Sequence, residues 1–159
     1  MQGNREKLRD TPSRLFILAA EHDGDDRFLL GFAYKEANLP HTLFFVNDGR
    51  QVIAYLKGDA PYGNRGEYPF PDLLLLDFRL PQATAMDVLE WMQRNGIKEP
   101  PVCILSGAAG QADQQKAIDL GAREFHVKPL MLHSTVTLLQ NISARWLKPA
   151  PQTRPNDAP

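Results

Sequence analysis

The segment from Pro71 to Pro81, PDLLLLDFRLP, limits what this chain can fold into more than any other. Four consecutive leucines lead directly into Asp77, and Pro81 ends the segment four residues later. Because successive side chains of a strand point to opposite faces, an unbroken apolar run predicts a strand buried on both faces, as in a parallel sheet covered by helices. Ligands of such sheets bind outside the carboxyl ends of the strands, so Asp77 is a candidate functional residue. The alternative is a solvated aspartate that starts a loop.

Apolar segments of strand length alternate with segments of helical spacing along the rest of the chain. This alternation predicts right-handed crossovers and a parallel sheet with helices on both faces. Length and element count favour a flavodoxin-like (βα)5 doubly wound α/β fold with strand order 2-1-3-4-5. The predicted strands are residues 14–20, 41–46, the leucine run ending at Asp77, 101–105 and 124–127; the predicted helices are 27–37, 51–56, 86–95, 111–120 and 130–147.

The predicted domain spans residues 13–147 and is flanked by a flexible N-terminal segment, 1–12, and a disordered Pro-rich tail, 148–159. Asp25 or Asp26 is the expected N-cap of the first helix. Residues 57–71 are rich in Gly, Pro and Tyr and predict a long loop between the second helix and the leucine strand.

Charge and composition exclude several classes of function. The formal net charge is -1, which gives no indication of a nucleic acid or an anionic membrane as partner. The single Cys103 excludes an internal disulfide and fits a reducing compartment. The apolar run at residues 15–20 is too short for a signal sequence or a membrane span. We therefore expect a cytoplasmic protein.

Polar side chains follow the predicted strands at the edge where ligands of such sheets bind. Strands one, three and four are adjacent in the expected order, so these side chains are predicted to surround one crevice. Neighbouring carboxylates are costly unless a cation neutralises them, and Mg²⁺ prefers oxygen ligands. The residues concerned are Glu21, His22 and Asp23 after strand one, Asp77 at the end of strand three, Ser106 at the end of strand four, and Lys128 after strand five.

With these motifs, the chain from about Ser13 to Leu147 resembles a response-regulator receiver domain of two-component signalling, of the CheY-like kind. An acidic cluster follows the first strand, and an aspartate ends the third strand with a proline four residues on. A Ser-Gly pair ends the fourth strand and Lys128-Pro129 ends the fifth. The loop before Pro71 resembles that of single-domain receivers related to bacterial phytochrome response regulators.

The resemblance implies a role for each of these residues. Asp77 would be the phosphoacceptor, taking a phosphoryl group from a histidine kinase or a phosphotransfer protein. Ser106 would form a hydrogen bond to that group, and Lys128 would pair with it. Phe125 occupies the aromatic switch position that works with Ser106. The resemblance also implies a cis peptide bond between Lys128 and Pro129.

The metal ligands depart from the family pattern at one position. Glu21 and His22 stand where the family carries two acids, and imidazole is a poor ligand for Mg²⁺. One hypothesis is weak Mg²⁺ binding through Glu21, Asp77 and the backbone carbonyl of Arg79, with Asp23 reaching in from the loop as an alternative to His22. A second is that protonated His22 replaces part of the metal charge. A third is a pseudo-receiver, and the simplest is a solvated histidine without a role.

We therefore expect a stand-alone bacterial receiver whose chemistry is limited to self-phosphorylation and slow hydrolysis, and which is not otherwise an enzyme. Its output would be contacts with a downstream protein or homodimer formation. The alternative is a phosphorylation-independent adaptor. A phosphotransferase of the haloacid-dehalogenase kind would need an acid where Arg79 stands. A flavin carrier would need a phosphate-binding loop after strand one, and none is present in the sequence.

Overall fold

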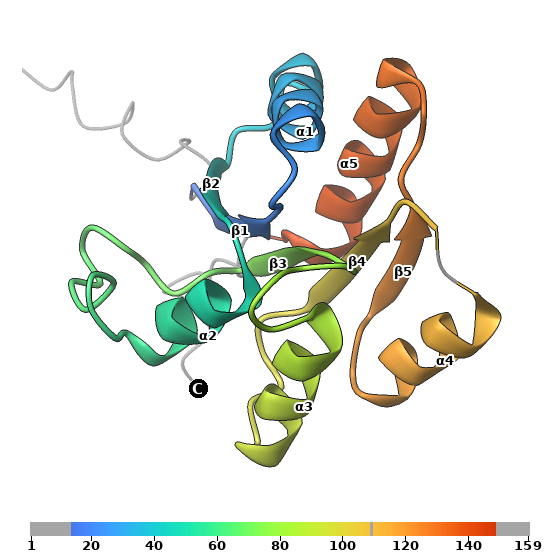
Figure 1. The fold of residues 1–159 in the computed structure, drawn as a ribbon. Helices are drawn as coiled ribbons and strands as arrows, with labels where there is room; N and C mark the ends of the chain where they lie inside the picture. The colour runs from blue at the N-terminus through green and yellow to red at the C-terminus, as the bar shows by residue number, and fades with distance from the viewer. Residues whose placement is uncertain (1–13, 109, 149–159) are drawn as a thin grey trace, which may run out of the picture.

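The computed structural model describes residues 14–108 and 110–148 (Figure 1). The expected flexible segment 1–12 and tail 148–159 lie, apart from Lys148, outside the described residues. Strands and helices alternate from one end of the described chain to the other. The elements are β1 (Phe16–Ala20), α1 (Gly24–Glu36), β2 (Thr42–Val46), α2 (Gly49–Lys57), β3 (Leu73–Asp77), α3 (Ala85–Arg94), β4 (Val102–Ser106), α4 (Gln111–Asp119), β5 (Glu124–Val127) and α5 (Leu132–Trp146).

The strands form one parallel sheet in the order β2-β1-β3-β4-β5, which confirms the predicted fold. Helices α1 and α5 cover one face, and α2, α3 and α4 cover the other (Figure 1). Strands β1, β3 and β4 are buried at every position, as expected for strands between two helical layers. Alternate leucines of β3 therefore belong to different cores, Leu74 to one and Leu75 to the other.

The start of α1 differs from the prediction. Asp23 is the N-cap, and its carboxylate accepts hydrogen bonds from the backbone N–H groups of Asp25 and Asp26, both at 2.9 Å. The prediction of Asp25 or Asp26 as N-cap was wrong because the helix begins directly after the strand-end residues Glu21 and His22. The early start places the first turn of α1 beside the carboxyl edge of the sheet.

The long loop between α2 and β3 is attached to the domain although it contains no strand or long helix. Tyr62 is buried in the core beside Tyr55, with the two ring centroids 4.8 Å apart. The Arg65 guanidinium donates hydrogen bonds to the backbone carbonyls of Tyr55 and Leu56, at 2.9 and 3.0 Å. The last carbonyl groups of a helix lack partners within the helix, and Arg65 supplies a donor to two of them. The carbonyl of Tyr55 also accepts from the backbone N–H of Gly58, at 3.1 Å.

Within the described residues, no helix has the length and apolar character that crossing a membrane requires.

Candidate functional site

Two buried carboxylates lie next to each other at the carboxyl edge of the sheet. Asp77 is the last residue of β3, and Glu21 directly follows the neighbouring strand β1. Their exposed fractions are 7% and 3%. The strand backbones hold both in place, because the N–H of Glu21 donates to the carbonyl of Val46 and the N–H of Phe78 donates to that of Leu105. Carboxylates placed this way need positive charge nearby.

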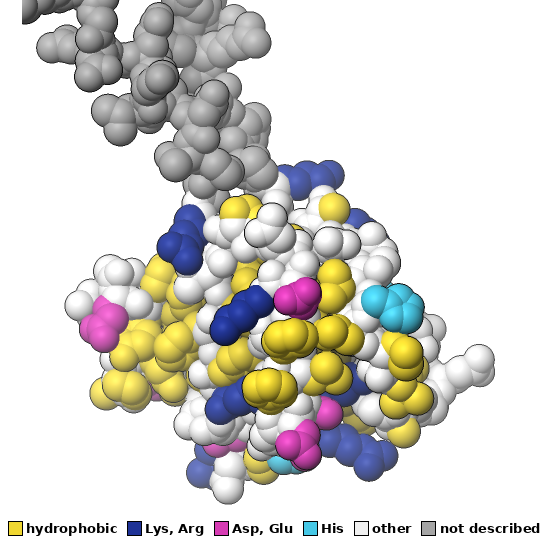
Figure 2. Space-filling model, turned by 90° about the horizontal axis from the view of Figure 1, so that it is seen from above, with side chains coloured by type: hydrophobic (Ala, Val, Ile, Leu, Met, Phe, Trp, Pro, Cys, Tyr) yellow, Lys and Arg dark blue, Asp and Glu magenta, His cyan; other side chains and the backbone are white. Residues whose placement is uncertain are grey.

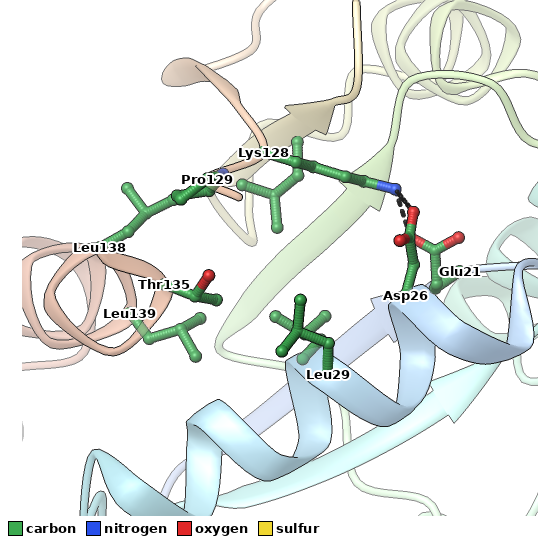
Figure 3. Close-up of a pocket in the computed structure, with 10 residues that line it drawn as sticks. Glu21, Asp26, Leu29, Lys128, Pro129, Thr135, Leu138 and Leu139 are labelled. Carbon is green, nitrogen blue, oxygen red and sulfur yellow. Dashed lines mark hydrogen bonds and ion pairs between the residues drawn. The ribbon is translucent and has the colours of Figure 1, made fainter. Parts of the chain in front are cut away.

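Lys128 supplies that charge from the end of β5. Its Nζ lies 2.7 Å from Oε2 of Glu21, 2.7 Å from Oδ2 of Asp26 and 3.4 Å from Oδ1 of Asp77. Figure 3 shows the Lys128 side chain extending toward Glu21 and Asp26. Its aliphatic part borders a cleft between α1 and α5, whose apolar lining includes Leu29, Leu30, Leu105, Pro129, Leu138 and Leu139.

The charges of this cluster are not balanced. Burial raises the pKa of Glu21, and the hydrogen bonds from Lys128 and from the backbone of Asp23 offset that effect only in part. Burial alone would lower the pKa of Lys128, but the bonds to Asp26 and Glu21 and the charge of Asp77 raise it above its ordinary value. Burial, with the charge of the neighbouring Asp77 added, keeps the pKa of Glu21 raised despite its ion pair with Lys128.

His22 lies on the opposite side of the two carboxylates from Lys128. Its Nδ1 is 3.4 Å from Oδ2 of Asp77 and 3.8 Å from Oε1 of Glu21, and its side chain is 45% exposed. Glu21, His22 and Asp77 each offer a ligand atom, and these atoms lie within 4.8 Å of one another. Asp23 is occupied as the N-cap of α1, so the structure brings His22 rather than Asp23 to the carboxylate pair.

Ser106 lies on β4, the strand beside that of Asp77, and Phe125 lies on β5, one strand further along the sheet. Ser106 ends β4, is 1% exposed, and its hydroxyl has no hydrogen-bond partner among the described residues. The backbone N–H of Lys128 donates to the carbonyl of Ser106 at 2.7 Å, which fixes the two residues side by side. Phe125 on β5 is half-buried, and its ring packs edge-on against Phe78, with centroids 5.6 Å apart.

The remaining expectations have mixed outcomes. The backbone N–H of Arg79 donates to Oδ1 of Asp77 at 3.4 Å, while the Arg79 side chain is exposed. The expected cis bond at Lys128–Pro129 is wrong, because the cis peptide bonds of the described residues are Ala60–Pro61 and Glu99–Pro100.

Sequence reasoning missed Asp26 as a partner of Lys128. The sequence signal for this contact is the acidic first turn of α1. With its N-cap at Asp23, the helix begins close enough to the sheet edge for Asp26 to reach Lys128.

The donor chemistry of the cluster suits a divalent cation in part. Carboxylate oxygens of Glu21 and Asp77 are ligands that Mg²⁺ prefers, whereas the imidazole of His22 is not. A carboxylate flanked by an ammonium group and a buried hydroxyl without a partner is suited to receive a group that carries negative oxygens. Asp77 has both neighbours.

Comparison with known proteins agrees with this geometry. The model of the response regulator receiver domain family matches residues 17–140. Response regulator Rcp1 of Synechocystis sp. is 27% identical over 138 residues, which are 86% of this chain and 91% of that protein.

Solved structures of response regulators are also similar to this chain. Response regulator RPA3017 in red light signalling of R. palustris superposes with a TM-score of 0.79 at 26% identity, covering 86% of this chain and 96% of that one. The phosphorylated cyanobacterial phytochrome response regulator RcpA gives 0.75 at 28% identity, with the same coverage. The Mn²⁺-bound form of Rcp1 gives 0.73 at 27% identity, covering 84% of this chain and 95% of that one.

Proposed function

This chain belongs to the response regulator receiver domain family of two-component signalling, and on that premise we propose that it accepts a phosphoryl group on Asp77 and thereby switches its contacts with other proteins. One observation carries the proposal. Asp77 is buried at the sheet edge, with the Lys128 ammonium 3.4 Å from its carboxylate, and the neighbouring strand ends at Ser106, whose hydroxyl has no hydrogen-bond partner in the described part of the chain. Receiver domains are signalling proteins, and the proposed chemistry is confined to the domain's own phosphorylation and dephosphorylation.

The proposed step is an in-line transfer. An oxygen of the Asp77 carboxylate attacks the phosphorus of the donor and a new P–O bond forms. The bond from phosphorus to the donor breaks at the same time, and its electron pair stays on the leaving group, which is a nitrogen in phosphohistidine or phosphoramidate and an oxygen in acetyl phosphate. A carboxylate is a competent nucleophile for making an aspartyl phosphate. Such a transfer depends mainly on positioning and on charge stabilisation, because the protein has little covalent work to do.

Lys128 and Ser106 are the groups that would stabilise the product. Lys128 already holds Glu21 and Asp26 at 2.7 Å, so its ammonium is fixed beside the reacting carboxylate before any donor arrives. The buried Ser106 hydroxyl needs an acceptor, since a buried polar group without one costs free energy. A phosphoryl oxygen on Asp77 would provide that acceptor.

A divalent cation would be held by Glu21, Asp77 and the backbone carbonyl of Arg79. When bound, it would neutralise negative charge on the phosphoryl oxygens during transfer. We assign Mg²⁺ as the expected ion of the family, with weak binding here because His22 replaces an oxygen ligand.

Phe125 is the proposed readout of phosphorylation. If Ser106 moves toward a phosphoryl group, the end of β4 moves with it, and Lys128 is joined to that end through its backbone. Phe125 lies three residues before Lys128 and packs on Phe78, the residue after Asp77. Two packing arrangements of this aromatic pair would couple the site to the surface around β5, α4 and α5.

The face beside the site has the exposed apolar side chains that a docking protein requires. Figure 2 looks onto the side covered by α1 and α5 and shows hydrophobic side chains among charged ones. The large exposed apolar residues of these elements include Phe28 and Phe32, stacked with centroids 6.3 Å apart, and Leu130 and Met131 before α5. We propose this face as the contact for a histidine kinase or phosphotransfer protein, and a downstream protein or a second copy as the output partner.

The experiment that tests the proposal is phosphorylation by a small donor. The full chain is treated with phosphoramidate or acetyl phosphate, with and without Mg²⁺, and intact mass is read over time beside Asp77→Asn and Lys128→Gln. We expect a Mg²⁺-dependent phosphoryl adduct in the wild type, none in Asp77→Asn, and a slower or smaller yield in Lys128→Gln. Circular dichroism confirms that each variant is folded.

Two results would contradict the proposal. Equal adducts in wild type and Asp77→Asn would place the chemistry elsewhere. The absence of any adduct in the folded wild type, under all conditions, would leave an adaptor that acts without phosphorylation.

A further inference from the structure

The group formed by Glu21, His22 and Asp77 has a donor set that differs from an all-oxygen Mg²⁺ site. It contains one imidazole nitrogen and oxygens from two carboxylates, with their ligand atoms within 4.8 Å of one another. The Nδ1 atom of His22 lies 3.4 Å from Oδ2 of Asp77 and 3.8 Å from Oε1 of Glu21. His22 is therefore close enough to both carboxylates to share a metal ion with them.

Lys128 and His22 use different oxygens of the same two carboxylates. Lys128 lies against Oε2 of Glu21 and Oδ1 of Asp77, while Nδ1 of His22 lies near Oε1 and Oδ2. The lysine consequently leaves one oxygen of each carboxylate on the His22 side, where Oε1 of Glu21 also accepts a hydrogen bond from the backbone N–H of Asp23 at 3.1 Å. A cation on the His22 side would therefore use oxygens other than those closest to the lysine.

The burial of the three ligands is that of a metal site with an open side. Glu21 and Asp77 are buried, whereas His22 is 45% exposed. Buried ligands give fixed positions, and the open side admits water or a phosphoryl oxygen as further ligands. Mg²⁺ gains little from such a set because it demands near-ideal octahedral oxygen coordination. Imidazole is a favoured ligand of divalent transition metal ions such as Zn²⁺ and Ni²⁺, whereas Mg²⁺ favours carboxylate, carbonyl and water oxygens.

We propose that this site selects a divalent transition metal ion over Mg²⁺ through the imidazole of His22. The inference uses the same residues as the proposed function and changes the identity of the ion at that site. It concerns the unphosphorylated protein, so it stands or fails separately from phosphoryl transfer.

The test is a metal titration of the full, unphosphorylated chain. Calorimetry with Zn²⁺ alone and with Mg²⁺ alone gives the two Kd values, and Co²⁺ absorption reports the coordination of the bound ion. The central variant is His22→Asp, which replaces the nitrogen with an oxygen donor at the same position. His133→Gln is the matched control, because His133 is an exposed histidine on α5 that is not part of the group.

We expect the wild type to bind Zn²⁺ at least about 100-fold more tightly than Mg²⁺, because imidazole is a favoured ligand of Zn²⁺ and a poor ligand of Mg²⁺. His22→Asp should lower that ratio by about tenfold or more, whereas His133→Gln should leave it unchanged. In labelled protein, the ring nitrogen resonance of His22 should shift on adding Zn²⁺ and not on adding Mg²⁺.

Three results would overturn the inference. They are tighter binding of Mg²⁺ than of Zn²⁺ by the wild type, a ratio unaffected by His22→Asp, and loss of Zn²⁺ binding in His133→Gln. A failed phosphorylation assay with normal Zn²⁺ selectivity would instead reject the proposed function and leave this inference intact.

Discussion

Two clusters of ionisable groups lie at opposite ends of the same sheet, and their charges are balanced in different ways. At the carboxyl edge, Glu21, Asp26 and Asp77 share the single ammonium of Lys128. At the start of β5, Glu124 is met by two basic groups. The Arg145 guanidinium forms an ion pair with it, and the His126 ring lies 3.1 Å from Oε2.

The pKa values of the two glutamates move in opposite directions. Burial raises the pKa of Glu21, and its single lysine does not reverse this. Burial would also raise the pKa of Glu124, but the hydrogen bonds from Arg145 and His126 outweigh that effect and lower it. The partly buried Glu124 is thus neutralised by its ion pair, whereas the cluster around Asp77 has more carboxylates than ammonium groups. A bound cation would reduce this excess negative charge, and phosphorylation of Asp77 would change it.

The largest expected effect comes from removing the ammonium group of Lys128. Lys128→Met leaves Glu21 and Asp77 buried without their partner and should lower the free energy of unfolding by about 2–3 kcal/mol, less than for a fully buried pair because Lys128 is partly exposed. Urea unfolding at neutral pH measures it. Adding Glu21→Gln to this variant should recover part of the loss, and a double variant less stable than Lys128→Met would contradict the account.

A matched pair of substitutions tests the difference between the two glutamates. Glu124→Gln should destabilise the protein by about 1–2 kcal/mol, because it removes the charge that Arg145 and His126 share. Glu21→Gln should be neutral or stabilising in metal-free buffer, because it relieves repulsion with Asp77. Thermal and urea unfolding of both variants, with a chelator present, measure these changes in the free energy of unfolding. Equal destabilisation by the two substitutions would contradict the proposed difference between the two glutamates.

The same pair differs in the pH dependence of stability. The folded pKa of Glu124 lies below its ordinary value of 4.5, so its stabilisation is present above pH 4.5 and is lost as the pH falls through the folded pKa. The folded pKa of Glu21 lies above 4.5, so its contribution becomes unfavourable as the pH rises from 4.5 through that value. Each unit of pKa difference corresponds to about 1.4 kcal/mol.

This prediction is checked by the stability difference between wild type and each glutamine variant from about pH 3 to pH 7. The two differences should change with opposite sign as the pH rises. Parallel curves would show that the two clusters are electrostatically equivalent.

The smallest effect is expected for substitution of Asp23, whose carboxylate caps α1 and is not one of the proposed metal ligands. Asp23→Ala removes the side chain that caps α1. It should lower the melting temperature, because two backbone N–H groups at the start of the helix lose their acceptor. Zn²⁺ affinity should stay at its wild-type value, because the Asp23 carboxylate is committed to the N–H groups of Asp25 and Asp26. Asp25→Ala, in the same first turn, is the control. A loss of affinity as large as in Asp77→Asn would make Asp23 a ligand.

The residues that sequence analysis placed correctly are those at strand ends. Asp77 could be placed because an apolar run of strand length fixes both a central strand and its last residue. Ser106 and Lys128 followed from the same logic once the strand order was inferred, and the order itself is confirmed. In a parallel sheet, one edge collects every carboxyl end, so topology alone brings these residues together.

Other features depend on geometry that a linear pattern does not contain. The partnership of Asp26 with Lys128 requires the exact phase of α1, and the helix begins earlier than the apolar spacing indicated. The choice between His22 and Asp23 depends on which of two neighbouring side chains turns toward β3. The isomer of the Lys128–Pro129 bond is set by the surrounding structure, since both isomers are close in energy for an X–Pro bond.

The most direct test of the central claim is to locate the modified residue after phosphorylation. The full chain is treated with phosphoramidate and a divalent cation, then with borohydride, which reduces an aspartyl phosphate to homoserine, and its peptides are mapped by mass spectrometry. We predict homoserine at position 77 in the wild type and nowhere in Asp77→Asn. Homoserine at position 26 in place of 77, or an unmodified Asp77 in protein that remains folded, would contradict the account.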